Sequence, residues 1–362
     1  MKTRTDVLTQ RGYDYSRVTV YDWLRLIATI YVVIGHSAYL QIQTTFGGVM
    51  YELPNDISPF YYNSILSGFR FLSGWVYGFH MPLFFMLSGA VLALRPISSF
   101  DKVLKSKVKR LLIPYFVYGW LFLFPVKRFV NFYANDSLTL AMKEFLVGGD
   151  SGHLWFLTAL FWCIIVFVLI VKILDKMNVT SVYVISIIAG TIYFLYSYIP
   201  FDVLGLRTGL SYIIYFTIGY IFEKERQENK RWNIKKTILA CIVLISLEII
   251  QKEYGILNSF FVILVGSLLT YILADLFDRA FPGAKNNRVW DFIVKNLFYV
   301  YLFHDPINYV VLRVFINGGY LKTALGCILY TVARTVGIFI ASLVLGESVD
   351  FIKKKINILL MD

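Results

Sequence analysis

Long apolar stretches alternate with short polar segments along the whole chain. Most of these stretches approach the ~20 residues that an α-helix needs to cross the hydrocarbon core of a bilayer. Backbone polar groups in lipid must pair within their own segment, so such stretches predict helices. We therefore expect an all-α, polytopic membrane protein with about ten transmembrane helices, at residues 22–42, 73–94, 111–130, 153–174, 181–199, 208–222, 234–251, 257–277, 292–312 and 324–345.

The composition supports this class. Hydrophobic residues make up 58% of the chain, charged residues make up 16%, and the mean hydropathy is +0.64. Such values are typical of membrane proteins. Because the apolar stretches recur without a polar linker, we expect a single membrane-embedded domain over residues 1–362 with short cytoplasmic tails. The first apolar stretch has no small-residue cleavage site, so no cleavable signal peptide is expected.

The net charge of +12 raises the question of nucleic acid binding. The Lys and Arg residues do not form one patch, however, but gather in alternate loops between the apolar stretches. Under the positive-inside rule this asymmetry places both termini in the cytoplasm. Basic loops also attract anionic lipid. The expected partner of these charges is therefore the lipid bilayer and not nucleic acid.

The first span carries side chains that are unusual in a membrane helix. Asp22 and Arg25 lie at its start, and His36 lies well inside it. At ~100° per residue, Arg25 and His36 share one helix face, about 16 Å apart along the axis, with Thr29 on the same face. Ionisable groups at membrane depth often mark function. The alternative is an interfacial Asp22–Arg25 pair and a histidine that pairs with a neighbouring helix.

All four histidines fall in the middle or outer half of the predicted membrane: His36, His80, His153 and His304. Histidine is the usual general base near neutral pH. Because no tight metal-ligand spacing occurs among them, we expect acid–base chemistry and no metal. The three cysteines lie within apolar stretches, and no disulfide is indicated.

Other charged or polar residues allow two interpretations. Lys107 and Arg110, three residues apart before the third span, face the same way on a helix. They are suited to hold phosphate, or they belong simply to the positive-inside charge. Glu248 and Arg334 lie within predicted spans, where other polar groups are expected to neutralise them. Ser88, in the small-residue segment 87–89, is expected to lie at a close helix contact rather than act as a nucleophile.

Five segments occur in an order that resembles the acyltransferase family 3 membrane proteins. Together they extend over nearly the whole chain, and ten spans is the usual count in that family. The chain is most similar to the stand-alone O-acetyltransferases that act on fucose and other sugars. The segments are YDWLRLIATIYVVIGHS (21–37), GFHMPLFFMLSG (78–89), KVKRLLIPYFVYG (107–119), HLWFLTALF (153–161) and YVYLFHDPI (299–307).

The resemblance implies roles for particular residues. The catalytic histidine of the family corresponds to His36, and its essential arginine corresponds to Arg25. Donor binding is then expected from Arg25, Lys107 and Arg110. The family commonly has arginine where Lys107 stands, and a lysine offers a point charge instead of a bidentate fork.

Acceptor binding is expected from residues in the later matching segments. By position these are His80, Trp155 and His304. The match around His304 is weaker, because Asp305 follows it where many members have proline.

The resemblance also implies a reaction. The family transfers acyl groups, often acetyl, from cytoplasmic acyl-CoA to hydroxyls of cell-envelope carbohydrates. We therefore expect a multi-pass enzyme of the bacterial inner membrane with acyl-CoA as donor substrate and no permanently bound cofactor. The acceptor would be an envelope or exopolysaccharide glycan, or a lipid-linked sugar.

Two questions stay open at this stage. His36 would act as general base on the acceptor hydroxyl, or it would carry the acyl group in a covalent relay. A different class of function is a transporter that exports a glycan or an acylated solute, since buried ionisable residues suit that role too. Against it, we find no inverted internal repeat.

Overall fold

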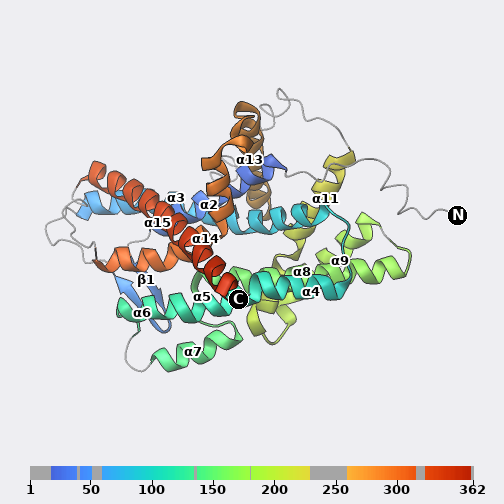
Figure 1. Ribbon diagram of the computed structural model, residues 1–362, viewed down its shortest axis with the longest axis horizontal. Helices are drawn as coiled ribbons and strands as arrows, with labels where there is room; N and C mark the ends of the chain where they lie inside the picture. The colour runs from blue at the N-terminus through green and yellow to red at the C-terminus, as the bar shows by residue number, and fades with distance from the viewer. Residues whose placement is uncertain are drawn as a thin grey trace.

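The computed structural model describes residues 18–38, 41–50, 59–133, 137–179, 181–228, 259–314 and 323–359. Within them the chain is mostly helical with one short β-hairpin, as Figure 1 shows. The expected helical class is therefore confirmed. By length and apolarity, three described stretches can cross a membrane: Gly74–Ala93, Ser137–Lys176 and Leu325–Lys355.

Helices lie at the predicted spans wherever these fall on described residues, and the predicted span 234–251 lies outside them. The first half of the chain contains α2 (Thr19–Ser37), α3 (Pro59–Ala93), α4 (Phe100–Lys107), α5 (Ile113–Tyr118), α6 (Phe124–Phe129), α7 (Ser137–Val147) and α8 (Trp155–Lys176). The second half contains α9 (Val182–Leu195), α10 (Leu206–Ser211), α11 (Ile213–Glu228), α13 (Ser259–Ala280), α14 (Arg288–Val314) and α15 (Ala324–Leu359). Short 3₁₀ turns occur at η3 (Gly152–Leu154), η4 (Tyr196–Tyr198), η5 (Val203–Gly205) and η6 (Ala284–Asn286).

The segment between the first two predicted spans is more ordered than a plain loop. α2 ends at Ser37, and the chain then forms an antiparallel hairpin from β1 (Gln41–Thr44) and β2 (Gly47–Met50). Gly47, at the turn, has a φ of 144°, a conformation that glycine adopts readily. α3 then begins at Pro59, well before the expected residue 73.

The third predicted span, 111–130, is interrupted by two wide π-helical turns. These are η1 (Val108–Leu112) and η2 (Gly119–Leu123), which separate α4, α5 and α6. Pro114 and Pro125 lie two residues after the ends of these turns, and a proline cannot donate the backbone hydrogen bond that keeps an α-helix regular. Turns of this kind often lie at functional sites.

Two helices go beyond the prediction from apolar stretches. α7 was not predicted, because Lys143 and Glu144 interrupt its apolar sequence. α15 continues to Leu359, past the expected end at residue 345. Its last part is charged but contains good helix formers, namely Glu347, the three lysines at 353–355 and Leu359. A search for apolar residues does not detect such a continuation.

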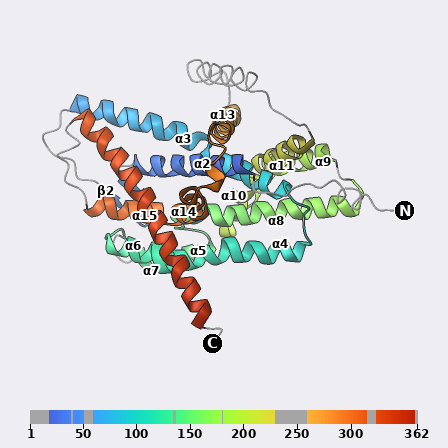
Figure 2. The same ribbon diagram turned by 45° about the horizontal axis from the view of Figure 1, so that its top comes forward.

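α2 lies centrally, in contact with α3, α13, α14 and α15 (Figure 2). Close packing of α3 on α11 depends on two glycines. A Cβ atom at Gly89 would lie 2.0 Å from the carbonyl oxygen of Phe216, and one at Gly219 would lie 1.9 Å from that of Met86. The expected role of the 87–89 segment in close helix packing is therefore confirmed.

Candidate active site

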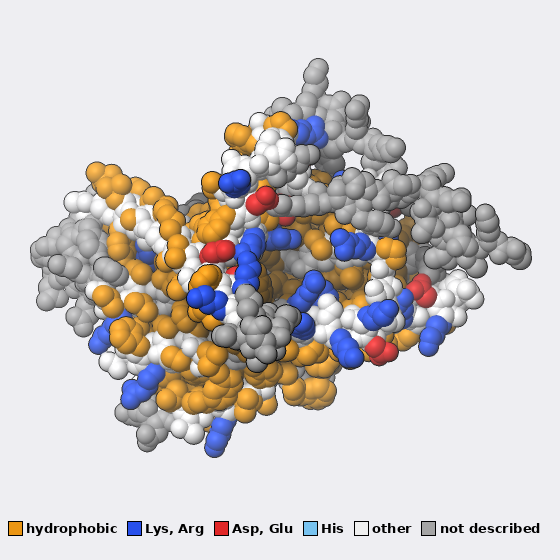
Figure 3. Space-filling view, viewed as in Figure 1, with side chains coloured by type: hydrophobic (Ala, Val, Ile, Leu, Met, Phe, Trp, Pro, Cys, Tyr) orange, Lys and Arg blue, Asp and Glu red, His pale blue; other side chains and the backbone are white. Residues whose placement is uncertain are grey.

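A cavity of about 810 Å³ lies between α2, α3, α4, α8, α14 and α15. Figure 3 shows Lys and Arg side chains gathered around a hollow in this part of the surface. Only one acidic residue, Asp350, belongs to the described lining. The cavity is thus strongly positive. Its cationic residues are Arg25, Arg95, Lys102, Lys107, Arg110, Lys295 and Lys353.

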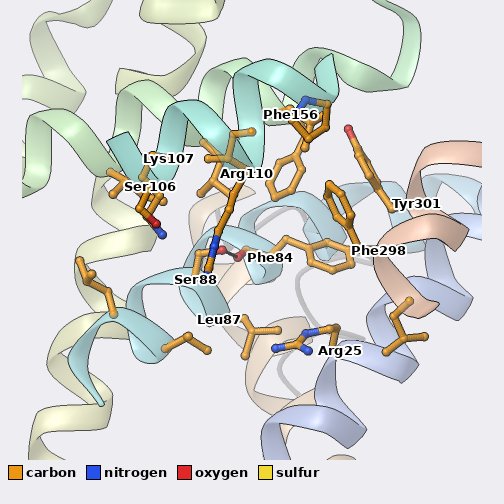
Figure 4. Close-up of a pocket in the computed structure, with 18 of the residues that line it drawn as sticks. Arg25, Phe84, Leu87, Ser88, Ser106, Lys107, Arg110, Phe156, Phe298 and Tyr301 are labelled. Carbon is orange, nitrogen blue, oxygen red and sulfur yellow. Dashed lines mark hydrogen bonds between the residues drawn. The ribbon is translucent and has the colours of Figure 1, made fainter. Parts of the chain in front are cut away.

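The three residues predicted to bind a donor all line this cavity. Arg25 projects into it from α2, and Arg110 projects from the opposite wall, with Lys107 nearby (Figure 4). The shared face predicted for Lys107 and Arg110 is retained although η1 intervenes. Burial and the neighbouring Arg110 lower the pKa of Lys107, because both disfavour its charged form. An anion placed between these cations would relieve that repulsion.

The start of α2 has the predicted polar face. Asp22 forms an ion pair with Arg25 at 3.7 Å, and the Arg25 side chain stays 39% exposed. Thr29 donates from its hydroxyl to the Arg25 carbonyl at 2.8 Å and also lines the cavity. His36 comes seven residues after Thr29, about 10 Å farther along the axis. His36 itself does not belong to the lining of the cavity, which includes Arg25 and Thr29 of α2 and, nearer the histidines, Tyr301.

The His36 imidazole is held by Asp305 of α14. Nδ1 of His36 lies 2.8 Å from Oδ1 of the carboxylate, a distance typical of an N–H that donates to a carboxylate. With the hydrogen on Nδ1, the Nε2 atom carries the lone pair. The His36 side chain is 17% exposed and that of Asp305 is 3% exposed. The pair is therefore anchored in the interior and accessible only at His36.

Pro306 explains why His153 joins this group. A proline inside a helix leaves the carbonyl four residues earlier without its backbone donor, and here that carbonyl belongs to Leu302. Nε2 of His153 lies 3.0 Å from this oxygen, and Nδ1 of His153 lies 3.2 Å from Oδ2 of Asp305. The carboxylate of Asp305 and the carbonyl of Leu302 can only accept hydrogen bonds. To donate to both, the His153 ring must carry a hydrogen on each nitrogen, which makes it a cation.

Tyrosine hydroxyls complete the shell around Asp305 and His153. Tyr309 donates to Oδ2 of Asp305 at 2.7 Å, and Tyr301 donates to the His153 carbonyl at 2.6 Å. The buried carboxylate thus accepts hydrogen bonds from His36, His153 and Tyr309. Such full pairing is what a buried charge requires.

His304 lies between the other two histidines. Its ring centroid is 4.7 Å from that of His36 and 5.0 Å from that of His153. Its Nδ1 donates to the Tyr301 carbonyl at 2.7 Å, so its Nε2 carries the lone pair. Within the described residues, this buried Nε2 atom has no hydrogen-bond partner. A buried acceptor of this kind is suited to a hydroxyl donor.

The backbone of His36 is fixed from the opposite side. Asn308 donates from its amide to the His36 carbonyl at 3.0 Å. Arg334 of α15 donates from Nε to the Asn308 side-chain oxygen at 2.7 Å. The expectation that a polar group of the bundle pairs with Arg334 is confirmed. Glu248 and Cys241 lie outside the described residues, while Cys163 and Cys327 are buried free thiols.

The other two residues predicted to bind the acceptor lie farther out. The His80 ring is 4.7 Å from the Tyr77 ring, which in turn is 5.9 Å from the His36 ring. Trp155 packs its ring on Phe156 and Tyr212, at 6.3 and 5.8 Å. His80 is therefore linked to His36 through the Tyr77 ring. Trp155 packs on the aromatic rings of Phe156 and Tyr212.

Sequence reasoning missed the residue at the centre of this cluster. Asp305 was treated only as a departure from a pattern, His153 was grouped with the other histidines for acid–base chemistry without a role of its own, and Tyr309 was given no role. The available signal was Pro306, since a proline within an apolar span leaves a carbonyl that needs a donor. An aspartate beside a histidine in the same span was a second signal.

The cluster can perform acid–base chemistry. Asp305 fixes the tautomer and orientation of His36, and the Nε2 atom, which carries the lone pair, can then take a proton from a hydroxyl. The neighbouring cationic cavity can hold an anionic ligand whose reactive end extends along α2. The cluster consists of His36, His153, His304 and Asp305.

A family described as an acyltransferase domain has a sequence model that matches residues 19–347. The match includes the cluster and every cationic residue of the cavity apart from Lys353. Comparison with curated proteins gives no match. Comparison with solved structures gives none either.

Proposed function

The chain belongs to acyltransferase family 3 and is a membrane acyltransferase, and from this premise we propose that it is an O-acyltransferase. It would move an acyl group, most simply acetyl, from cytoplasmic acyl-CoA to a hydroxyl of a cell-envelope or exopolysaccharide sugar. Both termini would lie in the cytoplasm of a bacterial cell, and the acceptor would arrive from the outer side.

The cationic cavity supports acyl-CoA as the donor. Coenzyme A carries a diphosphate and a ribose phosphate, and arginine and lysine are the side chains suited to such groups. Arg25, Lys107 and Arg110 meet in one cavity whose lining has seven cations and one carboxylate. A volume of about 810 Å³ lies in the usual range for sites of organic ligands.

The direction of α2 supports a path for the reactive arm. Arg25 would hold a phosphate, and the thin acyl-pantetheine arm would pass Thr29 toward His36. Phe156 and Tyr301 line this part of the cavity. Their apolar rings would exclude water from the thioester, which favours transfer over hydrolysis.

The chemical step follows from the His36–Asp305 pair. Nε2 of His36 takes the proton of the sugar hydroxyl, and the oxygen attacks the thioester carbonyl carbon. The new C–O bond forms, the C–S bond breaks, and the thiolate of CoA takes the proton back from His36. Asp305 keeps the hydrogen on Nδ1 and stabilises the cationic imidazole that forms between these events.

Acceptor contacts are proposed for His304 and His80. The unpaired Nε2 of His304 would accept a hydrogen bond from a sugar hydroxyl beside His36. His80 would act through the Tyr77 ring, which lies between it and His36. For Trp155, whose ring packs on Phe156, we propose only that it borders the acceptor region.

The observation that carries the proposal is the 2.8 Å contact between His36 and Asp305 next to a cavity rich in cations. To test it, inverted membrane vesicles that contain the protein receive radiolabelled acetyl-CoA, and alkali-labile label in the envelope fraction is counted together with free CoA. The wild type should release CoA and form labelled esters, and His36→Ala should do neither while inserting normally. A transporter would release no CoA. Equal labelling by a well-inserted His36→Ala variant contradicts the mechanism.

A further inference from the structure

Lys127, in α6, is a fully buried cation. Its side chain is 0% exposed, and its ammonium group lies 2.7 Å from Oδ1 of Asp150, which is 1% exposed. Tyr133 donates to the other carboxylate oxygen at 3.1 Å. The ammonium also lies 4.6 Å from the centre of the Phe132 ring.

A need for stability does not explain this pair. Moving two charges out of water costs several kcal/mol per ion, and apolar residues of similar size often stabilise a protein equally well or better. Charged residues buried in membrane proteins instead tend to mark function. The environment of Asp150 indicates what that function is.

Asp150 lies in a short, tightly bent segment that leads directly to His153. Asp150 has a φ of 41°, and Gly148 and Gly152 have φ values of 108° and 52°. Such left-handed conformations are unfavourable for most residues, and aspartate needs surrounding contacts to persist in one. The bond to Lys127 is such a contact. It fixes the backbone three residues before His153.

The same segment lies against Asp305. A Cβ atom at Gly152 would be 3.6 Å from the Tyr309 hydroxyl and 3.9 Å from Oδ2 of Asp305. The next residue, His153, bonds to that Oδ2 atom. A shift of the segment by a few tenths of an ångström would therefore change how Asp305 is held, and with it the orientation of His36.

The charges are also matched. The described surroundings contain two buried carboxylates, those of Asp150 and Asp305. Two groups can offset their negative charge: the ammonium of Lys127 and the ring of His153, which hydrogen-bonds through both nitrogens. Lys127 interacts electrostatically with Asp305 as well as with Asp150. Asp305 therefore meets His153 in addition to His36, and Asp150 meets Lys127.

We propose that Lys127 is a positioning residue for the transfer reaction: through Asp150 it fixes the 148–153 segment, so that His153 and Asp305 hold His36 in its reactive orientation. This inference rests on the proposed function. Lys127 itself touches no substrate. Its loss should lower kcat and leave the KM for acetyl-CoA unchanged, because the donor cavity is lined by other residues.

The test separates positioning from stability with a double variant, Lys127→Met/Asp150→Leu, assayed as acetyl-CoA-dependent CoA release in vesicles. The apolar pair should restore the melting temperature that Lys127→Met alone loses. We expect kcat to stay at least about 10-fold below the wild type with KM unchanged, since a 1 Å displacement alone costs up to ~10²-fold. Asp150→Asn, which keeps the size of the side chain, should show the same split. Lys143→Met, at an exposed lysine of α7, is the control.

Each outcome decides the question. Wild-type kcat in either folded variant at the Lys127–Asp150 pair overturns the positioning role and leaves the proposed function intact. A raised KM with unchanged kcat overturns it too, since the pair would then affect the donor cavity. If the wild type releases no CoA from acetyl-CoA, the proposed function fails and this inference fails with it.

Discussion

The cationic cavity and the cluster differ in how each residue is used. Around the cavity, seven cations share one space, so that an anion can meet several of them. Within the cluster each carboxylate oxygen of Asp305 has particular partners: His36 meets Oδ1, while His153 and Tyr309 meet Oδ2. Recognition of a diffuse negative charge tolerates the loss of one cation. Orientation of a proton acceptor does not tolerate the loss of its one carboxylate.

The difference in burial leads to the same conclusion. Arg25 is 39% exposed, so solvent and salt screen its interactions. Asp305 is buried, where an electrostatic interaction is stronger and an unpaired group is costlier. Substitutions in the cavity should therefore change donor affinity gradually. Those in the cluster should change the rate of the chemical step sharply.

The largest effect is expected for Asp305→Asn. The amide keeps the shape but no longer stabilises the cationic form of His36, so kcat for acetyl transfer should fall about 10²- to 10³-fold, within the range for general-base catalysis. Initial rates of CoA release against acetyl-CoA concentration would show this, with KM retained. Asp175→Asn removes an exposed carboxylate near Lys172 and serves as the control. A loss of less than threefold would mean that Asp305 does not orient the base.

A smaller effect is expected from a single added methyl group beside His36. A Cβ atom at Gly35 would lie 2.6 Å from Cε2 of Tyr77, whose ring packs between His36 and His80. Gly35→Ala should displace that ring and lower kcat about 10-fold, in line with the cost of overpacking. Gly78→Ala is the matched control, because nothing lies within 4 Å of a Cβ atom there. Equal rates in the two variants would show that the cluster is less rigid than the packing implies.

In the cavity, Arg110→Ala should raise the KM for acetyl-CoA about 10-fold, equivalent to ~1.4 kcal/mol of binding free energy. kcat should change little, because six other cations remain in the described lining. Raising the ionic strength should increase the KM of the wild type more than that of the variant. A large loss of kcat in Arg110→Ala with unchanged KM would contradict the assignment of donor binding to the cavity, because Arg110 would then act in the chemical step.

The smallest effect is expected for Lys107→Arg. A guanidinium can bind a phosphate in a bidentate manner, whereas the ammonium acts as a point charge. The KM for acetyl-CoA should fall about twofold to threefold at unchanged kcat, a change within the range of one additional hydrogen bond. Lys102→Arg, at an exposed residue of the same wall, shows whether any added guanidinium has this effect. An increase in KM would indicate that Lys107 is placed for a single contact.

The sequence was sufficient to predict which functional residues share one face of the same helix. His36 lies outside the lining of the cavity, but the shared face of Arg25, Thr29 and His36 follows from helical geometry, and α2 is one unbroken helix over these residues. The shared face of Lys107 and Arg110 follows in the same way. A single sequence shows such relations because they span only a few turns.

Relations between distant segments were harder to predict. His36 and Asp305 are 269 residues apart, and only folding brings them together. The ion pair of Lys127 could not be foreseen, because its partner, Asp150, lies in a bend that hydropathy does not reveal. The ends of α3 and α15 were missed since polar residues can continue a helix. Pairing and packing, not local pattern, decide these features.

The most direct test of whether the cavity binds the donor while the cluster performs the chemistry is the binding of CoA to purified His36→Ala protein in nanodiscs. It is measured by isothermal titration calorimetry. The variant should bind CoA with the dissociation constant of the wild type and yet transfer no acetyl group from acetyl-CoA. Arg110→Ala, measured alongside, should bind about 10-fold more weakly. Loss of CoA binding in His36→Ala, or acetyl transfer at the wild-type rate, would contradict the assignment of binding to the cavity and chemistry to the cluster.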